Sequence, residues 1–419
     1  MTVAFFCLAT IFANPGPSSE PPRAAVVAVP EPSAKAMRYY RSGLVLWGIG
    51  QVWVVVVPVV FLVSGLSARL RRLASRVGRS WFLTVGLYGV MYVVLNELVT
   101  MPLIYYASFA RPREYAMAAE GYTFGFWLID VVKGLGVASA LAFCLLWMPY
   151  LALRKMPRRW PWAVAIGYVP VAFGLMYLAP VVVDPLFDTF GPMKDKPLEA
   201  KILALADRAG IEGGRVYEVE KGTRTKAVNA YVKGLLGTHR IVLWDTLLRK
   251  LDERQVLFVM GHEMGHYALG HVVRSILLGG VGVLALCLMV QWGAVLVLRR
   301  FGGRFGLERL DDVASLPLAL VLGNLLVLAF SPVGLAYSRH QEHEADRFAL
   351  ELTHDNSAGA SGFAAMLDAN LGNPRPGALS VLWRSTHPPT GERIDFCNTY
   401  RPWETGAARR YEGLFRGPR

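Results

Sequence analysis

At 419 residues the chain is long enough for two domains, and its 54% hydrophobic content is too high for an ordinary pair of soluble domains. The formal net charge of +13 would suit a nucleic-acid partner, but the basic residues gather in short runs beside long apolar stretches, which is typical of membrane topology. The four cysteines form no C-x-x-C pair, so neither a disulfide framework nor a cysteine-ligated metal is expected.

An apolar segment at residues 3–13 begins the chain and is too short to span a bilayer. It resembles the core of a signal peptide, although the basic residues that usually precede such a core are missing. A linker rich in proline and alanine follows it. We therefore interpret residues 1–42 as a signal-like segment and linker, and leave open whether residues 1–14 are cleaved.

Six apolar runs of about 20 residues or more are long enough to cross a hydrocarbon core as helices. They predict a four-span membrane region at residues 43–183 and two further spans within residues 272–337. A long buried core helix is the alternative for each run. The predicted spans are residues 43–66, 81–106, 134–153, 163–183, 276–298 and 313–335.

Two polar segments, residues 184–271 and 338–419, have to combine into one soluble domain. Within the first, the run PLEAKILALADRAGI predicts a helix that ends at Gly210. Residues 227–232 and 241–244 are rich in β-branched and aromatic side chains and predict a hairpin. The expected fold is mainly α: a polytopic transmembrane helical bundle with an α+β domain of the zincin metalloprotease kind.

The sequence HEMGH follows a capping-box start at Asp252 and Gln255, so it lies within a predicted helix that ends near Gly270. His262 and His266 are four residues apart and share one helix face, so two imidazoles can bind one zinc ion. Glu263 can then act as the general base for an activated water. Two packed histidines on an amphipathic helix are the alternative.

A charged run, SRHQEHEADRFAL, follows the sixth predicted span and offers the third ligand. On a helix Glu342 and Asp346 share a face, whereas Glu344 points about 200° away from Glu342. One carboxylate can bind zinc while its neighbour orients a metal-bound imidazole. A solvated charged face is the alternative reading of this run. His271, after the helix-ending glycine, is expected to be solvated or interfacial.

Basic residues cluster in the loops between spans one and two, three and four, and five and six. By parity these three loops lie on one face of the membrane, which the positive-inside rule assigns to the cytoplasm. The catalytic segments are then expected on the extracytoplasmic side. The residues are Arg69, Arg71, Arg72, Arg76 and Arg79; Arg154, Lys155, Arg158 and Arg159; and Arg299, Arg300 and Arg304.

Six motifs together resemble the type I CAAX prenyl endopeptidases, which are integral membrane gluzincins related to bacterial heat-shock membrane proteases. The motifs are DPLFDTFGPM, NAYVKG, RIVLWDTLL, HEMGH, SRHQEHEAD and STHPPTGERI, and they span residues 184–394. The resemblance implies that Glu342 is the third zinc ligand and that Asp346 orients a ligand. It implies that His387 and Arg393 stabilise the oxyanion, and that Asn229, Ala230 and Tyr231 form an edge strand for the substrate.

Two features depart from the eukaryotic members of that family, which carry an extra N-terminal span and a catalytic domain facing the cytosol. The arginine-rich loops here favour the opposite orientation, and the Arg-, Ala- and Val-rich composition is typical of a bacterium, where prenylated substrates are not expected. True CAAX removal is therefore ranked below general processing of peptides near the bilayer.

The predicted function is a zinc metalloendopeptidase of a bacterial inner membrane that hydrolyses membrane-associated or extended polypeptides. It uses one Zn²⁺ per chain. Its expected partners are a peptide or membrane-protein substrate and the lipid bilayer, with no nucleic acid. The alternative is a catalytically silent, zinc-binding membrane scaffold or transporter. Glu263 favours the enzyme, because a closed structural site has no use for a base.

Overall fold

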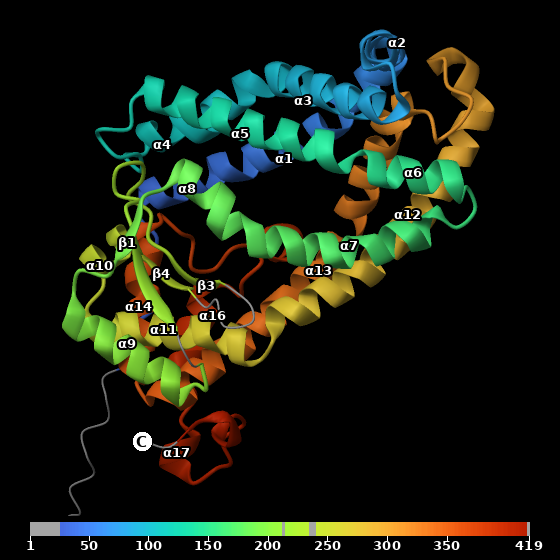
Figure 1. Cartoon of the computed structure of the whole chain (residues 1–419). Helices are drawn as coiled ribbons and strands as arrows, with labels where there is room; N and C mark the ends of the chain where they lie inside the picture. The colour runs from blue at the N-terminus through green and yellow to red at the C-terminus, as the bar shows by residue number, and fades with distance from the viewer. Residues whose placement is uncertain (1–25, 212–213, 234–239, 417–419) are drawn as a thin grey trace, which may run out of the picture.

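A computed structural model describes residues 26–211, 214–233 and 240–416. The predicted signal-like residues 1–14 and the turn of the predicted hairpin lie outside these ranges. The chain is mainly helical, with one small sheet (Figure 1). Long helices fill one end of the molecule, and the sheet and a group of shorter helices lie at the other. The expected fold class is confirmed.

The six predicted spans are confirmed as helical stretches long and apolar enough to cross a bilayer. The first starts earlier than predicted and ends at Val63, before its predicted limit, and the other five extend beyond the predicted limits. Three of them include a short π-helical or 3-10 segment, and one contains a turn at Leu146. In order they are α1 (Ala34–Val63); α3 (Trp81–Tyr105) with η1 (Tyr106–Ala110) and α4 (Arg111–Glu114); α5 (Phe124–Leu145) with α6 (Trp147–Lys155); α7 (Trp160–Leu178) with η2 (Ala179–Val183) and α8 (Asp184–Phe187); α12 (His271–Phe305); and η3 (Val313–Ser315) with α13 (Leu316–Thr353).

α13 runs without a break for 38 residues from the sixth span into the charged run that follows it. The predicted boundary at residue 337 is therefore not a break in the helix. Because a continuous helix is stiff, the span itself fixes the position of the charged run.

Four strands form the sheet, in the order β1-β2-β4-β3. β1 (Phe190–Pro192) is antiparallel to β2 (Arg215–Val219), which is parallel to β4 (Arg240–Trp244). β3 (Ala230–Lys233) pairs antiparallel with β4 and forms one edge, so the predicted hairpin pairing is confirmed. β3 starts later than predicted because the chain before it binds side chains: Val228 N–H donates to Asn370 Oδ1 at 3.1 Å.

The soluble part packs helices against this sheet. α9 (Lys196–Arg208) ends before Gly210, which has a left-handed φ of +77°, and α11 (Glu253–Ala268) begins with the predicted Asp252 and Gln255 capping box. Their buried side chains form one core with the sheet and α13, including Ile202, Leu243, Met260 and Phe348. The remaining helices are α10 (Asp245–Lys250), α14 (Asn356–Ala369), α15 (Ala378–Arg384), α16 (Thr390–Thr399), α17 (Pro402–Thr405) and η4 (Glu412–Leu414).

α2 (Leu66–Gly78) lies at the end of the bundle opposite the sheet, near the connection from α12 to η3 (Figure 1). Arg71 of α2 and Arg154 of α6 line the same cleft. The three predicted basic loops therefore lie together at that end. Arg71 forms an ion pair with Asp312 there, and the Arg154 guanidinium lies 5.5 Å from the Trp81 ring centre. This placement agrees with the parity argument and is independent of which side of the membrane the loops occupy.

Candidate active site

α11 places the two histidines of HEMGH one helical turn apart. The Nε2 atoms of His262 and His266 are 3.2 Å from each other, so both rings point toward the same place. α11 can approach α13 closely because of its glycines: a Cβ on Gly265 would lie 3.1 Å from Phe348 Cβ and 3.2 Å from Ala345 Cα. The histidines are thereby held against the helix that carries the carboxylates.

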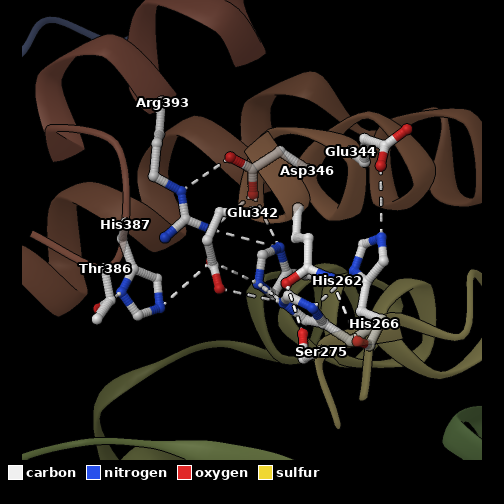
Figure 2. A network of polar contacts seen from close by, with 11 residues as sticks. His262, His266, Ser275, Glu342, Glu344, Asp346, Thr386, His387 and Arg393 are labelled. Carbon is white, nitrogen blue, oxygen red and sulfur yellow. Dashed lines mark hydrogen bonds and ion pairs between the residues drawn. The ribbon is translucent and has the colours of Figure 1, made fainter. Parts of the chain in front are cut away.

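Glu342 of α13 completes this group (Figure 2). Its Oε2 is 3.3 Å from His262 Nε2, and its Oε1 is 3.3 Å from His266 Nε2. Oε2 is buried and accepts no hydrogen bond within the described part of the chain. In a tetrahedral zinc site with bonds of about 2.0–2.1 Å, neighbouring ligand atoms are about 3.3 Å apart. The three side chains therefore have the spacing that a tetrahedral ion requires.

Asp346 lies one turn further along α13 and is almost fully buried. Its Oδ1 is 2.8 Å from His262 Nδ1, so it accepts a hydrogen bond from that ring and leaves Nε2 free for an ion. Arg393 of α16 donates to both oxygens of Asp346, at 2.8 and 2.6 Å. Its guanidinium also lies 3.7 Å from Glu342 Oε2, so it places a positive charge beside the carboxylates.

His387 lies in the loop between α15 and α16, and its ring points toward Glu342 (Figure 2). Its Nε2 is 3.3 Å from Glu342 Oε2, and its side chain is 55% exposed. Thr386 Oγ1 is 2.7 Å from His387 Nδ1. A hydroxyl that donates to Nδ1 leaves the proton on Nε2, so the ring can present an N–H toward the site.

Glu263 lies between the two histidines in sequence and has a partly buried side chain. Burial raises the pKa of its carboxyl above the usual range, although the neighbouring His262 and His266 oppose the shift. A carboxylate with a raised pKa is a stronger base than an exposed one, which suits proton uptake near neutral pH.

His271 and Glu344 also belong to this region, although neither is a predicted site residue. Glu344 points away from Glu342 as predicted, and lies 3.5 Å from His271 Nε2. His271 was expected to be solvated or interfacial; it is not solvated, since only 2% of it is exposed, because α12 begins there against α13. Its Nδ1 is 3.0 Å from His266 Nδ1. The sequence does contain one signal for His271: it is a histidine that follows His266 by five residues and comes directly after Gly270.

The predicted substrate residues lie at the edge of the sheet, beside α11. Asn229 is exposed, Ala230 is buried and Tyr231 is partly buried. Trp244 N–H donates to Asn229 O at 3.2 Å, so by antiparallel alternation the N–H groups of Ala230 and Val232 face the open edge.

The comparisons with known proteins agree with this geometry. Residues 192–400 match peptidase family M48, and residues 18–189 match the family described as CAAX prenyl protease N-terminal, five membrane helices. The uncharacterized metalloprotease YhfN of Bacillus subtilis is 36% identical over 345 residues, which cover 80% of this chain and 78% of that protein. The chain belongs to peptidase family M48. It is thus a multi-pass membrane metalloendopeptidase, and the scaffold or transporter alternative is disfavoured.

More distant M48 relatives extend the same pattern. CAAX prenyl protease 1 of Saccharomyces cerevisiae is 26% identical, and the match covers 72% of this chain and 69% of the yeast protein. The crystal structure of S. mikatae Ste24p aligns with a TM-score of 0.75 at 23% identity, covering 86% of this chain and 87% of the other. The M48 peptidase described here therefore shares that fold across both its membrane and soluble parts.

Proposed function

We propose that this M48 peptidase binds one Zn²⁺ through His262, His266 and Glu342 and uses Glu263 as its general base. The observation that carries the proposal is the set of 3.2–3.3 Å separations between the facing nitrogen and oxygen atoms of the three ligands. Two imidazoles and one carboxylate are a donor set that suits catalytic zinc and leaves a coordination position open.

His262, His266 and Glu342 would hold the ion, which would supply a Lewis acid that lowers the pKa of a water molecule, so that the water can lose a proton and attack a peptide carbonyl near neutral pH. Glu263 takes the proton from that water and passes it to the leaving amine. His387 donates from Nε2 to the oxygen on which negative charge develops. Arg393 supports this charge from behind Glu342 and holds Asp346, which keeps His262 oriented.

The second histidine ligand has its own support, provided by His271 and Glu344. If His266 binds the ion through Nε2, its Nδ1 carries the proton and donates to His271 Nδ1. His271 then carries its proton on Nε2, which faces Glu344. Arg410 and Tyr411 in turn donate to Glu344 at 3.0 and 3.2 Å. Each histidine ligand thus has a carboxylate behind it, one direct and one through an imidazole.

The substrate binds as an extended strand along β3, next to Asn229, Ala230 and Tyr231. The open-edge N–H of Ala230 donates to Asn229 Oδ1 at 2.9 Å, and a peptide carbonyl would take the place of that side chain. Main-chain pairing gives affinity with little demand on sequence, which suits a peptidase of broad range.

We place the enzyme in a bacterial inner membrane, with the active site on the extracytoplasmic side and membrane-associated or extended polypeptides as substrates. The relative from Bacillus and the shared end of the basic loops support this placement. Several relatives are named CAAX prenyl proteases, but processing without a prenyl group remains our first choice.

Mass spectrometry of protein termini in membranes tests the proposal. Cells that express the wild type should contain new peptide termini in membrane proteins, and cells that express Glu263→Gln at equal abundance should not. Finding the same new termini in both kinds of cell would contradict the role of Glu263 as the general base.

A further inference from the structure

Two clefts adjoin each other at the basic end of the bundle, far from the active site. One has a volume of about 700 Å³ and is lined by polar and aromatic side chains, among them Arg71, Trp81, Arg154 and Arg309. The other, of about 410 Å³, lies between α6, α7 and α12. Both are lined by Glu308, Arg309 and Asp311, so they meet at the connection before α13.

The second cleft is mainly apolar where it follows the helices. Leu153, Trp160, Val295 and Leu298 line it. Gln291 also lines it, and its Oε1 is buried without a hydrogen-bond partner in the described part of the chain. The apolar lining gives the groove room for a hydrocarbon chain.

The first cleft is lined by three arginines and by the carboxylates of Glu308, Asp311 and Asp312. Arg71 is paired with Asp312 and Arg309 with Asp311, whereas Arg154 lies over Trp81 with no acidic partner among the described residues. The outer face of α2 adds Arg69, Arg72 and Arg76, all exposed. The charges that line the cleft balance, so the surrounding arginines of α2 make the potential at its mouth positive, which favours an anion.

Tryptophans place the two clefts at the surface of the bilayer. Trp81 begins α3 and Trp160 begins α7, and each lines one of the clefts. Tryptophan is enriched at the level of lipid headgroups, where its ring is partly apolar and its N–H is wet. A basic mouth at that depth, with an apolar groove below it, matches the shape of a phospholipid.

We propose that this double cleft is a binding site for an anionic glycerophospholipid. The phosphate binds at Arg154 and the α2 side of the cleft, and one acyl chain lies in the groove along Val295 and Leu298. Basic pockets between transmembrane helices bind anionic headgroups in this way. A free phosphate ion would use the mouth alone and leave the apolar groove unfilled, so the site takes a lipid.

Native mass spectrometry of the purified full-length chain tests the site. The protein in detergent is titrated with dioleoyl phosphatidylglycerol, with dioleoyl phosphatidylcholine, and with inorganic phosphate. We expect the anionic lipid to bind at least about fivefold more tightly than the zwitterionic lipid, because one arginine near the surface contributes about that factor. Arg154→Gln should remove this preference, and Val295→Trp should weaken both lipids by filling the groove.

The matched control is Arg158→Gln, which removes an exposed arginine from the same loop outside both clefts. Zinc content in each variant reports whether the fold is intact. Equal affinity for the two lipids, or an equal loss in Arg154→Gln and Arg158→Gln, would overturn the site in favour of diffuse surface charge. Displacement of the lipid by millimolar phosphate would show a free-anion site instead.

Discussion

His262 and His266 are oriented by different partners, although they bind from the same helix face. Asp346 contacts His262 Nδ1 directly at 2.8 Å, and Arg393 holds that carboxylate from the other side. His266 meets a second imidazole, His271, which is backed by Glu344. In both cases the contact at Nδ1 leaves Nε2 as the ligand atom, so the protein itself orients both rings before an ion binds.

The partner of His266 can be tested at the level of one residue. We expect His271→Ala to lower zinc affinity about 10- to 100-fold, because support behind a ligand is typically worth this much. Competition with a zinc chelator measures the change. His340→Ala is the control: His340 also lies 3.5 Å from Glu344, but its side chain is 60% exposed and has no contact with His266 in the described structure. Equal affinities for the two variants would contradict the role of His271.

At the scale of elements, the pairing of α11 with α13 determines the site, because one helix carries the histidines and the other the carboxylates. Gly265 faces the backbone of α13 so closely that an added Cβ would meet two of its residues at 3.1–3.2 Å. Gly261 lies one turn earlier, where the nearest atoms of Ala349 and Thr353 would be 3.5 Å away, an ordinary contact.

These two glycines provide a matched pair of variants. Gly265→Ala should push the helices apart and destabilise the protein by about 1–3 kcal/mol, the usual cost of overpacking, with weaker zinc binding. Gly261→Ala should be neutral or up to about 1 kcal/mol more stable, because alanine is the better helix former. Denaturant midpoints in detergent give the comparison. Two variants of the same stability would mean that the helix contact is not tight.

The open edge of β3 gives a second prediction at this scale. Val232→Pro removes an N–H that faces away from β4, so the sheet should survive while an added peptide strand loses one donor. We expect KM for an extended peptide to rise several-fold with unchanged zinc content. A proline at Tyr231 would instead remove a donor that faces β4, and so would test the sheet rather than the substrate.

Val232→Ala keeps the N–H and shortens the side chain, and is therefore the control. If the alanine variant raises KM as much as the proline variant, the side chain and not the backbone binds the peptide.

Periodicity and short motifs predicted the six spans, the capped α11, the β3–β4 pairing and the opposed faces of Glu342 and Glu344, because each depends on residues close in sequence. The partnership of His271 with Glu344 joins residues on two different helices, so no local pattern indicated it. The same holds for Val27, whose backbone N–H donates to Asn398 Oδ1 at 3.1 Å and ties the segment before α1 to α16. The predicted boundary at residue 337 falls inside α13, because a change from apolar to charged residues marks a change of surroundings and not the end of a helix.

At the scale of the whole molecule, the three basic loops and the active site lie at opposite ends of the bundle (Figure 1). This arrangement allows one experiment to report sidedness. In a variant without the native cysteines, Ser75→Cys marks exposed α2 and Ala407→Cys marks an exposed segment of the soluble part. A membrane-impermeant thiol reagent on intact cells should label Ala407→Cys and leave Ser75→Cys unlabelled, because positive loops stay cytoplasmic.

The opposite labelling pattern would place the active site toward the cytosol while leaving the chemistry intact. Labelling of both positions would mean that the reagent had entered the cells. A cytosolic marker protein in the same preparation, which must stay unlabelled, controls for this.

The proposed mechanism requires that three side chains bind the metal and that Glu263 acts only as the base. The most direct test measures zinc per chain and peptide hydrolysis together in purified wild type, Glu263→Gln and Glu342→Ala. We predict that Glu263→Gln keeps about one zinc and loses hydrolysis by a factor of about 10² or more, as expected on removal of a general base. Glu342→Ala should lose the metal as well as the activity. Normal turnover in Glu263→Gln, or full zinc in Glu342→Ala, would contradict the proposed site.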